Sequence, residues 1–155
     1  MFVRIQVTKE KHHYTDHTNA SRTMLYNIKT LEWDDTLLSA LGIPKSMCPE
    51  VKTSAAHFGY ISYDGADIPI YGVAGDQQAA LFGQGGFAEG IAKNTYGTGC
   101  FLLLNNGKDY VTSHNGLITT LACSLPNQAQ HYALEGSVFI GGASVQLLRD
   151  RMQLI

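Results

Sequence analysis

The most informative part of the chain reads VAGDQQAALFGQ, from Val73 to Gln84. The apolar run from Ile68 to Ala74 predicts a strand, and Gln77 to Gln84 predicts a short helix after it. Asp76 therefore stands between a strand and a helix, where ligands of α/β sheets gather. Its carboxylate is either a base that accepts the proton of a substrate hydroxyl or the N-cap of the helix, and spacing alone favours the N-cap.

A second glycine-rich stretch, AKNTYGTGCF, runs from Ala92 to Phe101. Strands are predicted over Ala92 to Tyr96 and over Cys100 to Asn105, joined by Gly97-Thr98-Gly99. The backbone N–H groups of such a turn can hold an anion, and the Thr98 hydroxyl can donate to a phosphate oxygen. An ordinary tight hairpin, in which glycine supplies a positive φ, explains the same residues.

Apolar spacing and turn-forming residues predict the remaining elements. A helix should follow Asp34 or Asp35 and end at Gly42, while Phe2 to Val7 is either a strand or the end of a helix. Further predictions are strands over Phe58 to Ser62, Gly116 to Ala122 and His131 to Leu134, turns at Tyr63 to Gly65 and at Asn106-Gly107, and a helix over Ser137 to Met152. The glycines between Gly83 and Gly90 mark the best candidate for a domain boundary.

Composition excludes several classes of protein. The chain has 155 residues and a formal net charge of −2, without the clustered Lys and Arg that nucleic-acid binding requires. Hydrophobic residues make up 45%, which suits a folded domain, but no apolar run is long enough to span a bilayer. Cys48, Cys100 and Cys123 form no CxxC pair, which predicts free thiols in a reducing cytoplasm.

Two motifs for other chemistry lack the context that they need. Gly83 to Ala88 fits the GxGxxA dinucleotide pattern but follows a predicted helix instead of a strand. His13 and His17 could bind a metal if both lay on one helix, and a solvated polar turn is the favoured interpretation. We therefore predict no metal ligand in this sequence.

Taken together, Ala74 to Gln84 and Ala92 to Phe101 closely resemble the FGGY carbohydrate kinases that phosphorylate glycerol. That family has an α/β, actin-like and ribonuclease H-like ATPase fold. Supporting phrases are Thr18 to Leu25, Leu31 to Asp35, Asn115 to Leu117 and Tyr132 to Phe139. The resemblance implies that residues 1–84 are the C-terminal part of the family's N-terminal domain and that residues 85–155 begin its C-terminal domain.

The resemblance also implies a role for each candidate residue. Asp76 would be the general base and would contact glycerol together with Gln77 and Phe101. The turn Gly97-Thr98-Gly99 would hold the phosphates of ATP, and Mg²⁺ would neutralise their charge. The implied reaction transfers the γ-phosphate of ATP to glycerol, giving glycerol 3-phosphate and ADP.

Three parts of the family's site are not recognisable in this sequence: the first phosphate loop, the Arg-Glu pair that grips glycerol, and the glycine-rich segment that holds adenine. We therefore expect a segment of a longer protein that is inactive alone. The resemblance further implies that the full-length enzyme is a homo-oligomer. Two alternatives stay open. One is a sibling kinase acting on a pentulose or another polyol, and the other is a non-catalytic actin-like module.

Overall fold

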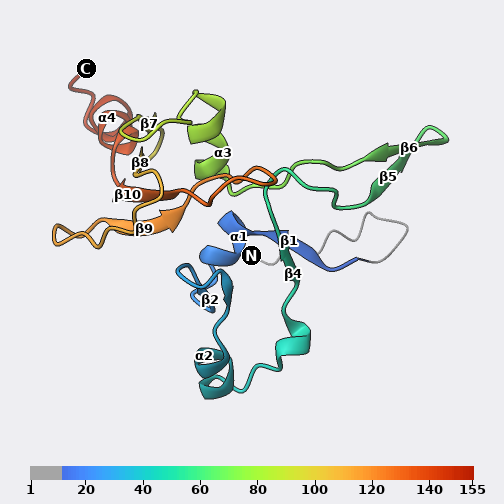
Figure 1. The fold of residues 1–155 in the computed structure, drawn as a ribbon. Coiled ribbons are helices and arrows are strands. Elements are labelled where there is room, and N and C mark those ends of the chain that lie inside the picture. Colours follow the sequence, from blue (N-terminus) through green and yellow to red (C-terminus); the bar gives the residue numbers. More distant parts are fainter. Residues whose placement is uncertain (1–11) are drawn as a thin grey trace.

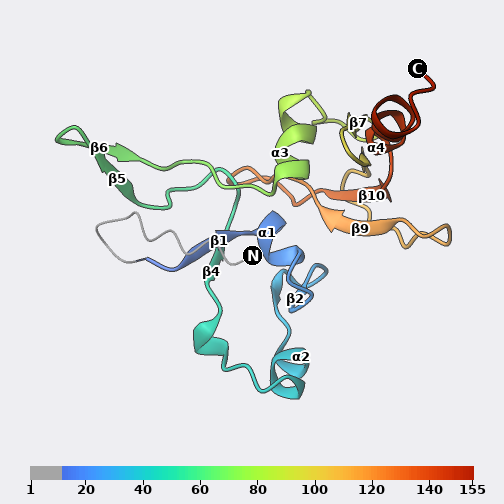
Figure 2. The same ribbon diagram turned by 180° about the vertical axis from the view of Figure 1, so that it is seen from behind.

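The computed structural model describes residues 12–155, so the prediction for Phe2 to Val7 lies outside the described residues. The N-terminal elements and a C-terminal sheet lie next to each other, and a long hairpin extends away from both (Figure 1). The same arrangement is visible from behind (Figure 2). Among residues 12–155, no helix combines the length and the apolar character that crossing a lipid bilayer requires.

The N-terminal elements are short and surround a small apolar cluster. They are β1 (Tyr14–Asp16), α1 (His17–Ser21), β2 (Tyr26–Asn27), β3 (Glu32–Trp33), α2 (Asp35–Ala40), the 3₁₀ turn η1 (Lys45–Met47) and β4 (Glu50–Lys52). β1 pairs with β4 in parallel, and β2 pairs with β3 in an antiparallel hairpin. Tyr26 packs edge-on against Trp33, with ring centroids 5.3 Å apart. Ala20 and Leu121 complete the cluster, and Leu121 comes from the C-terminal sheet, so the cluster joins the two halves of the chain.

The observed α2 confirms the predicted helix and its ends. Asp34 is the N-cap, and its side chain accepts hydrogen bonds from the N–H groups of Thr36 at 3.0 Å and Leu37 at 3.1 Å. Gly42 follows the helix with a φ of +65°, which glycine adopts without strain. The expected apolar face is only partly buried, because Leu38 is buried whereas Leu37 is exposed.

A hairpin of β5 (Tyr60–Tyr63) and β6 (Ala66–Pro69) forms the projecting arm. Its predicted turn is confirmed, since both residues of Asp64-Gly65 adopt a positive φ. Both strands are shorter than predicted: β5 begins at Tyr60 instead of Phe58, and β6 ends at Pro69 instead of Ala74. Ile70 still exchanges backbone hydrogen bonds with Phe58 and Gly59, and the chain after it is irregular until α3 (Asp76–Gly83).

The C-terminal half is built on a four-stranded antiparallel sheet in the order β7-β8-β10-β9. Its strands are β7 (Ala92–Tyr96), β8 (Cys100–Asn105), β9 (Ile118–Leu121) and β10 (Tyr132–Val138). The bounds of β7 and β8 are those predicted, while β9 is shorter and β10 longer than expected. Leu81 of α3 packs with the buried Leu103 and Ala133, so α3 covers one face of this sheet.

The turn at Asn106-Gly107 does not make the predicted hairpin. Gly107 has a φ of +65°, as a turn requires. However, β8 pairs with β10, and β9 lies on the far side of β10 as an edge strand. The prediction is wrong because the chain order of strands does not fix their order in the sheet.

The predicted helix over Ser137 to Met152 begins too early. β10 continues to Val138, which pairs with Cys100 of β8. The helix α4 (Gly142–Gln146) begins at the second glycine of the pair Gly141-Gly142 and passes into a π-helical turn, η2 (Leu147–Arg151). The first residues of the predicted helix are taken by the sheet because Ser137 and Val138 complete the ladder with β8.

Candidate functional site

Asp76 is the first residue of α3, and its side chain is exposed. The N-cap position belongs to Gly75, with a φ of −64° and a ψ of +147°, so the interpretation of Asp76 as the N-cap is wrong. Its Oδ1 accepts a hydrogen bond from the N–H of Gln77 at 2.8 Å. The positive end of the α3 dipole favours a carboxylate in this first turn. The Asp76 carboxylate is thereby held at the N-terminal end of α3, where it remains accessible.

The backbone that precedes Asp76 is fastened to a buried carboxylate. Asp16 is fully buried, and its Oδ2 accepts a hydrogen bond from the Thr18 hydroxyl at 2.7 Å. The Thr18 oxygen in turn accepts the N–H of Gly75 at 2.7 Å. A Cβ at Gly75 would lie 2.6 Å from Oε1 of Gln78, so the buried Gln78 side chain would have to shift. The position of Asp76 is therefore fixed by hydrogen bonds that connect Gly75 through Thr18 to Asp16, the last residue of β1.

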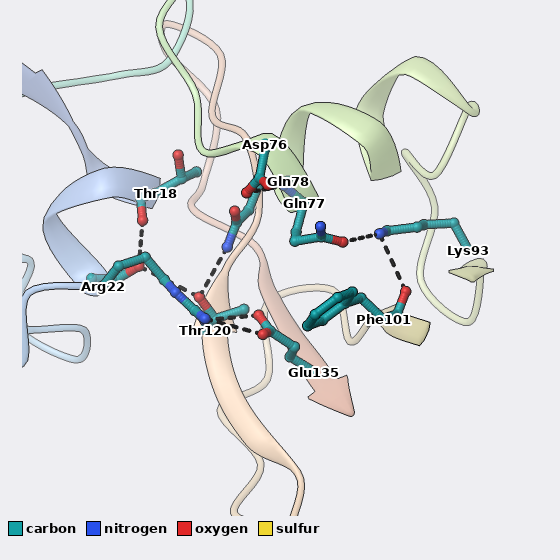
Figure 3. A network of polar contacts seen from close by, with 10 residues as sticks. Thr18, Arg22, Asp76, Gln77, Gln78, Lys93, Phe101, Thr120 and Glu135 are labelled. Carbon is teal, nitrogen blue, oxygen red and sulfur yellow. Dashed lines mark hydrogen bonds and ion pairs between the residues drawn. The ribbon is translucent and has the colours of Figure 1, made fainter. Parts of the chain in front are cut away.

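Gln77 and Phe101 are joined through a lysine (Figure 3). The Nζ of Lys93 donates to Oε1 of Gln77, to Oγ1 of Thr95 at 2.7 Å and to the backbone oxygen of Phe101 at 3.3 Å. Only 4% of Lys93 is exposed. Thr95 pairs with Phe101 in the sheet. Thr95 lies two positions before Gly97 and Phe101 two positions after Gly99, so Lys93 binds both strands close to the glycine turn.

An ion pair between a buried carboxylate and a partly solvated arginine lies near this lysine (Figure 3). Glu135 of β10 is 3% exposed, and Arg22 donates to both of its carboxylate oxygens, at 2.7 Å and 3.0 Å. Burial lowers the pKa of Lys93, and the carboxylates of Glu135 and Asp76 act in the opposite direction. Buried charges require partners; Glu135 has Arg22, and Lys93 has the three oxygens of Gln77, Thr95 and Phe101.

The turn Gly97-Thr98-Gly99 joins β7 to β8, as predicted, and contacts the start of α4. The N–H of Gly142 donates to the oxygen of Gly97 at 2.9 Å, and the N–H of Gly141 donates to the oxygen of Thr98 at 2.8 Å. A Cβ at Gly99 would lie 2.7 Å from the oxygen of Val138. Close packing, and not a positive φ, therefore explains Gly99, while the Thr98 side chain is exposed.

Sequence reasoning missed Thr18, Arg22, Lys93 and Glu135. A signal existed for Lys93, since a lysine that shares a strand face with Thr95 in an amphipathic strand can face inward. The partners of Thr18 and Arg22 lie 57 and 113 positions away along the chain. No local pattern reveals contacts of that separation.

The helical metal site considered for His13 and His17 is not formed. His13 precedes β1, whereas His17 begins α1, and Nδ1 of His17 contacts the Tyr26 hydroxyl at 2.9 Å. Burial lowers the pKa of His17 and outweighs the opposing effect of Asp16. Across residues 12–155, no group of three or more His, Cys, Asp or Glu side chains is placed to hold a metal ion.

Known proteins match the chain closely in sequence. The model of the N-terminal domain of the FGGY family of carbohydrate kinases matches residues 2–83. A glycerol kinase of Alkaliphilus oremlandii (strain OhILAs) is 62% identical over 152 residues, which are 96% of this chain and 30% of that protein. A glycerol kinase of Fusobacterium nucleatum is 63% identical over 153 residues, 97% of this chain and 31% of that protein. The chain thus spans less than a third of the length of these curated relatives.

Solved structures define the class of fold. The crystal structure of Plasmodium falciparum glycerol kinase with ADP matches with a TM-score of 0.89 and 43% identity, over 96% of this chain and 30% of that chain. A ligand-bound xylulose kinase from Lactobacillus acidophilus, 22% identical, has a TM-score of 0.80 over 97% of this chain and 31% of that chain, and it shows the same fold. The chain is accordingly part of an α/β, actin-like ATPase fold, as predicted. It belongs to the FGGY family of carbohydrate kinases.

Proposed function

We propose that this chain is part of an enzyme that transfers the γ-phosphate of ATP to glycerol, giving glycerol 3-phosphate and ADP. The observation that carries the proposal is the exposed carboxylate of Asp76 at the start of α3, beside the contact that joins Gln77 to Phe101. Support comes from the two glycerol kinases that are 62% and 63% identical over almost the whole chain. A purely structural module has no need for an accessible base at this point.

In the proposed reaction, Asp76 is the general base. Its carboxylate takes the proton of a terminal hydroxyl while that oxygen forms a bond to the γ-phosphorus; the bond from this phosphorus to the ADP oxygen breaks, and ADP leaves with the electron pair. Gln77 hydrogen-bonds a glycerol hydroxyl, and the half-buried ring of Phe101 packs against the glycerol carbons. Holding the reactants in line supplies much of the rate in such a transfer.

The phosphates of ATP would be held by the turn Gly97-Thr98-Gly99, where the exposed Thr98 hydroxyl is available as a donor. Mg²⁺ commonly uses one or two protein carboxylates and completes its shell with phosphate oxygens and water. Asp76 is assigned to the hydroxyl proton, and no group of three or more His, Cys, Asp or Glu side chains within residues 12–155 is placed to hold a metal ion, so we assign no Mg²⁺ ligand to this chain. When bound, the ion neutralises charge on the transferred phosphoryl group.

We also propose the division of the chain between two domains. Residues 1–84 form the C-terminal part of an N-terminal FGGY domain, and residues 85–155 begin the C-terminal domain. Support comes from the irregular segment between α3 and β7, which holds Gly85 and Gly90 with positive φ. The full-length enzyme would act in the cytoplasm as a homo-oligomer, and the free thiols of the three cysteines accord with a reducing compartment.

The direct test uses an exchange chimera, in which this chain replaces the matching segment of the A. oremlandii glycerol kinase. We expect glycerol-dependent ADP release from the chimera, and none from the 155-residue chain alone. Asp76→Asn should lower kcat by about 10²–10⁴-fold because a general base is lost. ADP release by a coupled assay measures each rate.

The matched control is Asp64→Asn, which removes an exposed turn carboxylate in the projecting hairpin and should leave kcat unchanged. Unchanged turnover in Asp76→Asn would rule out the general base. A pentulose that is phosphorylated faster than glycerol would instead indicate the sibling polyol kinase. Turnover by the chain alone would show that it assembles a complete site.

A further inference from the structure

Lys93 is a buried cation whose three N–H groups meet three oxygens. One of these oxygens is on the Gln77 side chain, one is the Thr95 hydroxyl and one is the backbone oxygen of Phe101. An ammonium group has three donors and no acceptor, so this set uses its full capacity. Two of the three partners belong to residues proposed to contact the substrate, although Lys93 itself is only 4% exposed.

The contact with Gln77 fixes which end of its amide is available. A glutamine amide carries an acceptor oxygen and a donor NH₂ group, and rotation by 180° exchanges them. The rotated amide would bring its NH₂ group against the Lys93 ammonium, and neither group could accept a hydrogen bond. The observed orientation directs Oε1 toward Lys93 (Figure 3) and leaves the Nε2 donors for other partners.

We propose that Lys93 is a positioning residue that holds the Gln77 amide so that it acts toward the substrate only as a hydrogen-bond donor. This inference rests on the proposed function, and it deepens that function by stating what the site recognises. The favoured substrate is a polyol that offers a hydroxyl oxygen as an acceptor to Gln77 and gives the proton of another hydroxyl to Asp76. Lys93 also donates to the Phe101 backbone oxygen, but the pairing of Phe101 with Thr95 holds that backbone without the lysine, so Lys93 acts on the site through Gln77.

A double-mutant cycle in the exchange chimera tests the proposal. Lys93→Met should raise the KM for glycerol by about 10-fold and change kcat by less than about 3-fold, since the interaction lost is one of binding. In a Gln77→Ala background, Lys93→Met should change KM by less than about 2-fold, because a residue that acts through Gln77 has nothing left to position. A merely structural lysine would raise KM equally in both backgrounds, and that result would overturn the inference.

A second variant keeps the proposal testable if Lys93→Met does not fold. Gln77→Glu preserves a partner for Lys93 and replaces the free NH₂ donor by an acceptor oxygen. It should raise the KM for glycerol by about 10-fold or more, and an unchanged KM would refute the requirement for a donor. Lys108→Met, an exposed lysine, is the matched control and should change neither constant.

Failure of this inference can be told from failure of the proposed function. An active chimera whose KM responds to Lys93→Met equally in both backgrounds retains the kinase assignment and loses the positioning role. A chimera that contains the native Lys93 and Gln77 but phosphorylates no glycerol, while the unmodified relative does so under the same conditions, contradicts both.

Discussion

Asp16 shows how one buried side chain can organise a site that it does not enter. Its Oδ2 accepts from the N–H and hydroxyl of Thr18 and from the hydroxyl of Ser54, and its Oδ1 accepts from the N–H and the side chain of Asn19. Two oxygens thus serve five donors without exposure to solvent. The Thr18 oxygen accepts the N–H of Gly75, which directly precedes Asp76, so Asp16 fixes the backbone at the start of α3 through Thr18.

The substitution Asp16→Asn should destabilise the protein. Whichever oxygen is replaced, the new NH₂ group faces donors, and at least two hydrogen bonds to a charged acceptor are lost. We expect the free energy of unfolding of the exchange chimera to fall by about 2–4 kcal/mol. Urea denaturation followed by fluorescence measures this change. Asp35→Asn, which affects only an exposed pair with Lys45, is the control and should shift stability by less than about 0.5 kcal/mol. Equal midpoints for Asp16→Asn and the parent would contradict the argument.

Among the elements, the bidentate pair of Arg22 and Glu135 connects the end of α1 to β10. Removing Arg22 leaves a carboxylate that is 3% exposed without its main partner. Arg22→Met should lower the free energy of unfolding of the exchange chimera by about 1–3 kcal/mol, less than for a fully buried pair because Arg22 is partly solvated.

The same urea titration tests whether this loss comes from the unpaired charge. The double variant Arg22→Met with Glu135→Leu should regain part of the stability, because both charges are then absent. A double variant that is less stable than Arg22→Met alone would show that the carboxylate left unpaired is not the source of the loss.

The elements also show what the sequence can predict. α2, β7 and β8 follow from local features, namely a side-chain cap, alternation and glycine turns, and for β7 and β8 the predicted bounds match the observed ones. The hairpin expected at Asn106-Gly107 and the early start of the C-terminal helix were wrong, because the observed structure at both places depends on pairing between distant strands. The candidate residues Asp76, Gln77 and Phe101 came from the sequence, whereas Lys93, which joins two of them, required the three-dimensional contact.

At the scale of the whole molecule, the C-terminal elements leave large apolar side chains in solvent. Phe139 is 80% exposed and Ile155 is 71% exposed, and most of the large apolar residues of α4 and η2 are exposed too. Exposed apolar side chains that gather in one part of a chain commonly mark a surface that contacts another protein segment. The chain also spans only about 30% of the length of its relatives, so in a protein of their length other segments are available to cover this surface.

The 155-residue chain alone should therefore self-associate. We expect its apparent mass in size-exclusion chromatography to rise with concentration, and a hydrophobic dye such as ANS to bind strongly. The exchange chimera is the control, because the remaining parts of the relative can pack against the same face; it should bind little ANS and elute at a mass independent of concentration. A chain that stays monomeric at about 100 µM and binds no more dye per mole than the chimera would show that these side chains do not form an interaction surface.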